Sequence, residues 1–213
     1  MRCGNLEFET MSRIPFPSLE DSDDSMNSPH PYLWLVLDEI MDPQNFGALL
    51  RSAYFLGGET NKIGIMVCSK NSAPPSPVVS AASAGALELC QVYSTSNLPR
   101  TLNAAKNDGW RVLGAAAFAP NTNNGNDDEP PVECQDLSDV EPATKKNPTI
   151  LVLGSEGHGL RTLVAKACTG FVRIPGAITN DENQQKENSS VGVDSLNVSV
   201  TGGIMLWNLV NGK

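Results

Sequence analysis

Short apolar runs alternate with longer patterns of helical period along most of the sequence after residue 31. The apolar runs have the length of buried strands, and they occupy residues 32–37, 63–68, 91–93, 110–117, 149–153 and 171–174. Apolar residues recur at helical spacing in the segments between them, which are residues 43–56, 76–87, 97–108, 160–167 and 196–209. This alternation predicts an α/β fold with a mostly parallel sheet. Strands that are apolar throughout also need helices on both faces of the sheet.

Capping and turn residues predict where two of these helices begin and where one of them ends. Asp42-Pro43 forms the turn that precedes the first helix, and Gly57-Gly58 ends that helix. Ser76 and Pro77 have the residue types of an N-cap and a first helical position. We therefore expect one continuous helix from Ser76 through Leu87.

Three polar segments interrupt the pattern. Residues 1–31 are rich in Ser, Pro and Asp and predict a disordered leader. Residues 119–148 and 176–193 predict two polar insertions, of which the first is long and mobile, in a single domain that spans residues 32–213. The acidic leader predicts neither a signal peptide nor an organellar transit peptide. Since no apolar run approaches the roughly 20 residues that cross a bilayer, we expect no membrane partner.

The net charge of −9 argues at first against a nucleic-acid partner, because phosphate contacts require Lys and Arg. The distribution of the charge changes this conclusion. Residues 1–31 carry −4, residues 119–148 carry −5 and residues 176–194 carry −3, so the rest of the chain nets +3. The body of the domain is therefore mildly basic, which permits RNA binding.

The cysteines and histidines indicate the redox compartment and bear on whether the chain holds a metal site. The five cysteines are scattered without a CxxC pair, which is typical of a reducing compartment. His30 and His158 are the sequence's two histidines, and neither lies near a cysteine pair, so we expect no metal site. We interpret His158 as a surface or loop residue. A serine hydrolase lacks support, because the chain contains no G-x-S-x-G motif.

Three predicted strands end in loops that suit a ligand. In parallel sheets ligands bind beyond the carboxyl ends of the strands, where Asp42-Pro43, Gly154 and Pro175 are expected to lie. The loop from Gly154 to Gly159 follows a strand and opens a helix, where backbone N–H groups can meet an anion. Its glycine spacing is G-x-x-G-x-G, which counts against a dinucleotide-binding dehydrogenase. Taken alone, this stretch is also compatible with a simple Gly-rich turn.

Several polar residues near these loops have both a functional and a structural interpretation. Arg51 is the only charge on its helix, so its guanidinium either extends to solvent or faces an anion. Glu156 is either a functional acid or a carboxylate stabilised by a helix N-terminus. Ser195 and Asn197 are either helix caps or members of a site.

Three motifs in order carry a resemblance to a known family. They are DPQNFGALLRSA at residues 42–53, LVLGSEGHGL at residues 151–160 and DSLNVSVTGG at residues 194–203. They resemble the signature motifs of the SpoU/TrmH branch of the SPOUT RNA methyltransferases. The likeness spans roughly residues 33–209, and three ordered motifs are far more specific than any one alone.

The resemblance implies a role for each matching residue. It implies a pocket for S-adenosylmethionine in which backbone groups contact the cofactor, with these contributing residues: Leu153, Gly154, Ile174, Pro175, Ser195 and Leu196. It implies a reacting centre formed by Asn45, Arg51, Glu156, Asn197 and Ser199. The family assigns this Arg to the target 2′-hydroxyl, often as proton acceptor. Because a guanidinium is effectively always protonated, we expect Arg51 to stabilise a developing alkoxide or to grip phosphate, and a base role stays a hypothesis.

The resemblance also implies a deep trefoil knot at the C-terminal end of the fold, a homodimer and an activity. That activity is S-adenosylmethionine-dependent 2′-O-methylation of RNA, without a metal. The sequence most resembles fungal mitochondrial enzymes that act on a guanosine of large-subunit rRNA, which favours a mitochondrial location over a cytoplasmic one. Those enzymes carry an N-terminal RNA-binding domain and a presequence that this sequence lacks, so we expect this segment alone to bind RNA weakly. A tRNA methyltransferase and a non-catalytic RNA-binding or assembly factor on the same scaffold are the alternatives.

Overall fold

The computed structural model describes residues 7–17, 30–58, 63–116, 134–176 and 195–212. Eight strands of this described part form one sheet in the order β1-β4-β3-β2-β7-β5-β8-β6, and every neighbouring pair is parallel. The strands are β1 (Glu9–Thr10), β2 (Leu33–Leu37), β3 (Ile63–Cys68), β4 (Val92–Thr95), β5 (Arg111–Ala115), β6 (Cys134–Asp136), β7 (Thr149–Leu153) and β8 (Gly170–Arg173). The helices are α1 (Pro43–Gly57), α2 (Pro77–Ala82), α3 (Ala86–Leu89), α4 (Leu98–Asn107), α5 (Thr162–Ala167) and α6 (Val198–Asn211), with a 3-10 turn η1 (Leu137–Asp139). The predicted α/β fold with a parallel sheet is confirmed.

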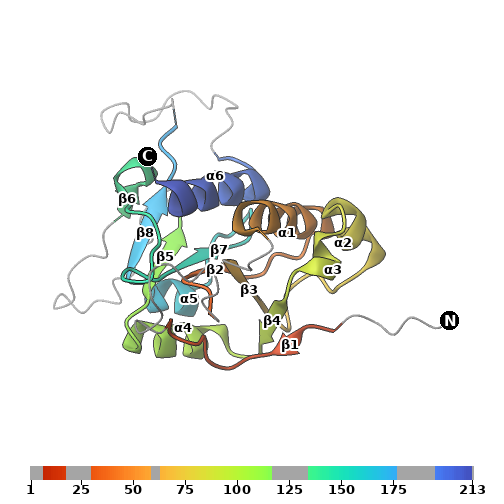
Figure 1. The fold of residues 1–213 in the computed structure, drawn as a ribbon, viewed down its shortest axis with the longest axis horizontal. Helices are drawn as coiled ribbons and strands as arrows, with labels where there is room; N and C mark the ends of the chain where they lie inside the picture. The colour runs from red at the N-terminus through yellow and green to blue at the C-terminus, as the bar shows by residue number, and fades with distance from the viewer. Residues whose placement is uncertain (1–6, 18–29, 59–62, 117–133, 177–194, 213) are drawn as a thin grey trace, which may run out of the picture.

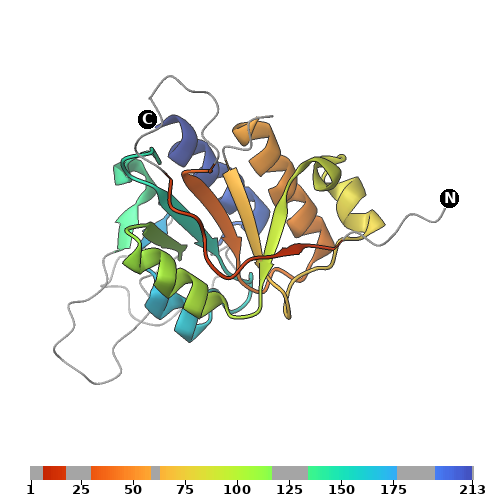
Figure 2. The same ribbon diagram turned by 60° about the horizontal axis from the view of Figure 1, so that its bottom comes forward.

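Helices cover both faces of the sheet. Helices α1, α2, α3 and α6 lie on one side and α4 and α5 on the other (Figure 1). After rotation of the molecule, α4 and α5 come forward while α1 and α6 stand behind the strands (Figure 2). No helix in the described part of the chain is long and apolar enough to span a bilayer.

The central strand β2 shows why both faces are covered. Leu33, Leu35 and Leu37 point into the core beneath α1 and α6, whereas Trp34 and Val36 point into the core beneath α4 and α5. All five side chains are buried. An uninterrupted apolar strand therefore indicates two covered faces, as we expected from the sequence.

The expected single helix over residues 76–87 is wrong. Ser76 does cap a helix, because its side chain accepts a hydrogen bond from the Val79 N–H. The helix ends at Ala82, since Ala84 and Gly85 adopt positive φ angles of 52° and 87°. The left-handed conformation at these two residues breaks the helical hydrogen-bond pattern, and α3 begins anew after them.

Part of the leader is structured, which corrects the prediction of disorder over residues 1–31. Strand β1 pairs with β4, and Ile14 is fully buried on the same side of the sheet as α4. The Phe16 ring packs edge-on against Trp110, with ring centroids 5.8 Å apart. Figure 2 shows this segment, in red, crossing that side of the sheet. A few apolar side chains thus anchor a polar segment; residues 1–6 and 18–29 lie outside the described residues.

The predicted insertion at residues 119–148 is also partly ordered. Residues 134–148 add strand β6 to the edge of the sheet and form the turn η1. Leu137, Val140 and Ala143 are buried against the core beneath α6. Apolar residues spaced three apart therefore hold this stretch in place despite its acidic composition. Residues 117–133, and the second predicted insertion apart from Gly176, lie outside the described residues.

Candidate functional site

Two of the three motif-bearing segments, at residues 151–160 and 194–203, line one cavity of about 300 Å³ at the carboxyl ends of the strands, and Asn45 of the first segment is hydrogen-bonded to its lining residue Glu156. The cavity is lined by Ala115, Ala116, Leu153, Gly154, Ser155, Glu156, Gly159, Ile174, Ser195, Leu196, Val198, Thr201 and Met205. Five of the six residues that we assigned to a cofactor pocket are among them. The sixth, Pro175, is exposed beside Ile174 and does not line the cavity.

The wall of this cavity next to β7 is a tight loop. Ser155 and Gly159 pair through two backbone hydrogen bonds of 3.1 and 2.9 Å, which fold the loop back on itself. A Cβ at Gly154 would lie 2.3 Å from the Gly159 carbonyl carbon and 2.5 Å from the Leu160 nitrogen. Because both neighbours are backbone, only glycine allows the loop to close here. The close approach explains the first glycine of the motif.

Glu156 is the centre of a hydrogen-bond network that joins the three motifs. Its Oε1 accepts hydrogen bonds from Asn45 Nδ2 at 3.1 Å, Asn197 Nδ2 at 2.6 Å and the Val198 N–H at 3.2 Å. Asn197 Nδ2 also donates to Asn45 Oδ1 at 3.0 Å. The carboxylate therefore lies at the N-terminus of α6, where the helix dipole stabilises negative charge. Glu156 thus both stabilises this helix end and joins the three motifs, and its role in a reaction stays a prediction.

Asn197 likewise combines two roles. Its Oδ1 caps α6 by accepting hydrogen bonds from the Ser199 and Val200 N–H groups at 2.8 and 3.4 Å. The Ser199 hydroxyl donates to the same oxygen at 2.6 Å. Since the cap occupies the oxygen and the network uses the amide nitrogen, the side chain satisfies both.

Four of the five residues assigned to the reacting centre are therefore in mutual contact, and Arg51 is not. Arg51 lies on the exposed side of α1, and its side chain forms no hydrogen bond or ion pair with any residue of the described part. Asn45, six positions earlier on the same helix, is only 8% exposed. The fold of one chain thus separates the guanidinium from the Glu156 network.

Sequence reasoning missed residues on both sides of the loop. Ala115, Ala116, Thr201 and Met205 line the cavity, and their small or apolar side chains carried no signal of their own. Asp38, whose side chain is buried, and Arg161, whose side chain is partly exposed, form an ion pair behind the loop. A carboxylate directly after an apolar strand and an arginine directly after the Gly-rich loop were the signals available.

The residues around the cavity fit an adenosyl sulfonium. The side chains of Leu153, Ile174, Leu196 and Met205 offer an apolar wall for a flat base, and the ends of β7 and β8 offer backbone groups for its edges. The Glu156 carboxylate supplies negative charge that favours a cation. Within the described residues, no three His, Cys, Asp or Glu side chains gather where a metal ion could be held.

The chain is similar in sequence to a set of rRNA methyltransferases. Residues 32–207 match the model of the SpoU rRNA Methylase family. The human protein named "rRNA methyltransferase 1, mitochondrial" is 38% identical over 195 residues, which are 92% of this chain and 50% of the human one. The Schizosaccharomyces pombe protein of the same name is 36% identical over 99% of this chain and 67% of its own length. RlmB of Pseudomonas syringae, named "23S rRNA (guanosine-2'-O-)-methyltransferase", is 34% identical over 83% of this chain and 57% of its own length. The chain thus spans about half the length of the human relative.

Solved structures show the same fold. A TrmH-family protein from Porphyromonas gingivalis superposes with a TM-score of 0.62 at 29% identity, over 83% of this chain and 58% of the other. The SpoU methyltransferase AviRb from Streptomyces viridochromogenes, solved in complex with AdoMet, has a TM-score of 0.60 at 21% identity over 92% of this chain and 64% of its own. At 21% identity, the likeness to AviRb concerns the fold alone.

Proposed function

The chain belongs to the SpoU rRNA methylase family, and from this premise we propose that it transfers a methyl group from S-adenosylmethionine to a ribose 2′-hydroxyl of RNA. One observation carries the proposal: Glu156, Asn45 and Asn197 form a single hydrogen-bond network at the edge of a cavity of about 300 Å³. Asn197 and Glu156 also hold the N-terminus of α6, but that structural role does not require Asn45 of a third segment to join them beside a cavity. A shared ligand explains their meeting.

The cavity residues would hold the cofactor in a bent or extended form. Backbone groups of Gly154, Ile174 and Leu196 would contact its polar edges, while Leu153 and Met205 supply apolar walls. When bound, the cofactor supplies an electrophilic methyl group on a sulfonium. The Glu156 carboxylate favours that positive charge, and its three donors keep it in a fixed orientation.

The catalytic contribution of the chain is alignment and electrostatics. The Asn45–Glu156–Asn197 network fixes the mouth of the cavity, so that an incoming hydroxyl oxygen approaches along one line. Arg51 would stabilise the developing alkoxide or hold the adjoining phosphate. Its side chain is exposed rather than turned into the network, so that role requires RNA or a second subunit to bring the groups together.

The exposed face of α6 supports a homodimer. Val200, Ile204 and Trp207 form one stripe along this helix, Leu196 lies just before its N-terminus, and the four side chains are 40–57% exposed. The opposite face of α6 is already buried in the core through Met205, Leu206 and Leu209. A helix that is apolar on both faces needs a second partner. Because Leu196 also lines the cavity, a second copy on this stripe would adjoin the cofactor pocket.

The family further favours a trefoil knot at the C-terminal end. After β8, the chain reaches α6 on the α1 side of the sheet, although α5 lies on the other side. The path between them passes through residues 177–194, which lie outside the described residues. We include the knot in the proposal on the basis of the family.

We place the target in the large-subunit rRNA of mitochondria, on a guanosine. The proposal rests on the names of the human and Schizosaccharomyces pombe relatives, which include "mitochondrial", and on the guanosine in the name of RlmB. A tRNA target is the alternative, because the resemblance to the SpoU/TrmH branch is compatible with either RNA.

The test is methyl transfer from labelled S-adenosylmethionine to separated pools of mitochondrial rRNA, cytoplasmic rRNA and tRNA. Reverse transcription at low nucleotide concentration then maps the methylated ribose. Label on one guanosine of mitochondrial large-subunit rRNA supports the proposal. Label on tRNA alone would show that the substrate is tRNA and not rRNA. Cofactor binding without transfer to any pool would instead indicate an RNA-binding or assembly factor.

A further inference from the structure

One buried residue, Asp38, holds both ends of the loop that forms the cavity wall. The Asp38 N–H donates to the Leu153 carbonyl at 2.8 Å, immediately before the loop. The Asp38 carboxylate accepts a hydrogen bond from the Arg161 N–H at 3.0 Å, immediately after it. The intervening residues 154–160 supply Gly154, Ser155, Glu156 and Gly159 to the cavity. Asp38 therefore fixes the span across which this loop must fold.

The guanidinium of Arg161 reinforces the second anchor. It contacts Asp38 Oδ1 through Nε at 2.8 Å and through Nη2 at 2.6 Å. These hydrogen bonds to Asp38 raise the pKa of Arg161 above its ordinary value, with the charge of Asp38 adding to the effect. The Asp38 side chain is completely buried, whereas that of Arg161 is 36% exposed. Arg161 is thus the counter-charge for a carboxylate that water does not reach.

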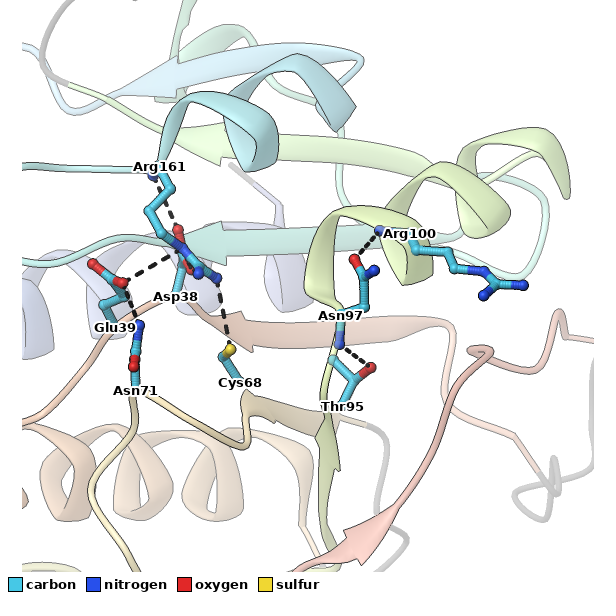
Figure 3. A network of polar contacts seen from close by, with 8 residues as sticks. All are labelled: Asp38, Glu39, Cys68, Asn71, Thr95, Asn97, Arg100 and Arg161. Atoms are coloured by element: carbon cyan, nitrogen blue, oxygen red, sulfur yellow. Dashed lines mark hydrogen bonds and ion pairs between the residues drawn. The ribbon is translucent and has the colours of Figure 1, made fainter.

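Further contacts orient the guanidinium from the β3 side. Arg161 Nη2 lies 3.6 Å from Cys68 Sγ, at the end of β3, and Arg161 Nε lies 3.6 Å from Glu39 Oε1. Asn71 Nδ2 donates to the same Glu39 oxygen at 2.6 Å. Figure 3 shows these side chains converging on Arg161 from the ends of β2 and β3, while Arg100 points away. Glu39 has a φ of 62°, a conformation that these contacts help to maintain.

We propose that Asp38 and Arg161 are positioning residues for the methyl transfer, because they clamp the loop 154–160 in the conformation that shapes the cofactor cavity and places Glu156 against Asn45 and Asn197. This inference rests on the proposed function for its kinetic consequence, and on the fold alone for its structural one. The same clamp links two motifs, since Asp38 directly follows β2 and lies only a few residues before α1, which has Asn45 on its first turn.

The physical reason is that the loop is weakly stabilised by itself, whereas its two ends are held firmly by Asp38. Residues 156–159 are exposed, and the two backbone hydrogen bonds between Ser155 and Gly159 form a short hairpin. Such an element is marginal without support at its ends. Arg161 contacts the buried Asp38 carboxylate at both oxygens, with two guanidinium nitrogens on Oδ1 and the backbone N–H on Oδ2, and these contacts supply direction as well as attraction. Loss of one partner leaves the other charge uncompensated and lets the loop move.

The experiment compares Asp38→Asn, Arg161→Gln and Arg161→Lys with the unaltered chain. Asp108→Asn is the matched control, because it breaks a second two-contact Arg–Asp pair, with Arg13, that lies far from the cavity. Each protein is titrated with S-adenosylmethionine by calorimetry and assayed for KM and kcat. Hydrogen exchange of the Ser155 and Gly159 amides gives a readout that does not depend on cofactor or RNA.

We expect Asp38→Asn and Arg161→Gln to lower kcat/KM by on the order of 100-fold, mainly through the KM for S-adenosylmethionine. Arg161→Lys keeps the charge without the planar fork, so it should fall between them and the unaltered chain. Exchange at Ser155 and Gly159 should accelerate at least tenfold while β2 and β7 stay protected. Asp108→Asn should match the unaltered chain in all three measurements.

Other outcomes separate the two proposals. Folded Asp38 and Arg161 variants with unchanged exchange and unchanged KM would overturn the clamp and leave the proposed function intact. An unaltered chain that binds no S-adenosylmethionine would overturn the proposed function, and the exchange data would still judge the clamp. If Asp38→Asn and Arg161→Gln do not fold, exchange in Arg161→Lys decides: protection equal to that of the unaltered chain overturns the clamp.

Discussion

Glu156 and Asn197 lie 41 positions apart in the chain, yet their side chains meet through a hydrogen bond of 2.6 Å from Asn197 Nδ2 to Glu156 Oε1. The contact ties the loop after β7 to the first turn of α6. Asn45 of α1 donates to the same carboxylate oxygen, so three motifs share one acceptor atom. The relationship makes the site a property of the whole fold rather than of one loop.

Substitutions of Asn197 can separate its role as a helix cap from its role in this network. Asn197→Ser keeps an oxygen that caps α6 but lacks the amide donor to Glu156. We expect methyl transfer to fall by on the order of 100-fold while the melting temperature stays close to that of the unaltered chain. Full activity in a folded Asn197→Ser protein would show that Asn197 is only a cap.

Arg51 should be important for transfer and unimportant for stability. Its side chain is exposed and has no partner among the described residues, so Arg51→Ala should leave the free energy of unfolding within about 0.5 kcal/mol. Transfer should drop by on the order of 100-fold or more, because the proposed function assigns Arg51 to the developing alkoxide or its phosphate. Arg100→Ala, an exposed arginine on α4, is the control.

The pH–rate profile of Arg51→Lys then addresses how Arg51 acts. Lys keeps the charge but not the fork. Partial activity with an unshifted pH–rate profile would support electrostatic stabilisation, whereas a profile displaced to the range of a lysine would support proton transfer. An Arg51→Ala protein with full activity would remove this residue from the mechanism.

Gly202 and Gly203 provide a matched pair for the packing of α6 on α1. A Cβ at Gly202 would lie 2.3 Å from Leu49 Cδ2 and 2.8 Å from Leu153 Cδ1. We therefore expect Gly202→Ala to destabilise the protein by about 1–3 kcal/mol in urea unfolding. A Cβ at Gly203 meets only Ser52 Oγ at 3.6 Å, so Gly203→Ala should be neutral or stabilising by up to about 1 kcal/mol. Equal effects of the two changes would contradict this close approach.

The stripe on α6 predicts which substitution disrupts self-association. Trp207 is 57% exposed, and Trp207→Glu should convert a dimer to a monomer in sedimentation at micromolar concentration, because it places a charge in an apolar contact. Leu163 on α5 is 65% exposed on the other side of the sheet, so Leu163→Glu is the control. If the unaltered chain sediments as a monomer, α6 needs another partner and the homodimer proposal fails.

Cys168 should make the protein sensitive to alkaline pH. Burial raises the pKa of its thiol to about 12, above the ordinary value of 9.0. In the unfolded chain the thiol ionises near its ordinary pKa, so its contribution to stability is complete below pH 9.0 and is lost as pH rises toward 12. Relative to Cys168→Ala, the unaltered chain should lose up to about 1.4 kcal/mol per pH unit above 9.0 in urea unfolding. A difference between the two proteins that stays constant from pH 7 to pH 10.5 would contradict this burial.

The sequence patterns predicted most of the fold, because a strand buried on both faces is apolar along its whole length. Strands β3 and β7 occupy the predicted residues, since each is an apolar run closed by polar residues at both ends. The break between α2 and α3 escaped prediction, because Ala84 has a helix-favouring side chain and its positive φ comes from the surroundings. Strands β1 and β6 escaped because single buried residues such as Ile14 anchor segments of polar composition.

Sequence patterns likewise predicted some residues of the site and missed others. The motif residues were predicted together, and Asn45, Glu156 and Asn197 do lie together. Their roles in transfer stay predictions. Asp38 and Arg161 were missed because their ion pair joins two residues 123 positions apart in the chain. The place of each residue, after an apolar strand or after the Gly-rich loop, does not by itself reveal its partner.

The strand order has a consequence for how the molecule is made. Leu35 of β2 pairs with Ile65 of β3 on one side and with Leu151 of β7 on the other. During synthesis the central strand therefore gains its first neighbour early, and the 80 residues between Cys68 and Thr149 must follow before the second emerges. Until then one edge of β2 stays open to other chains, so this protein should depend on chaperones while it is still attached to the ribosome.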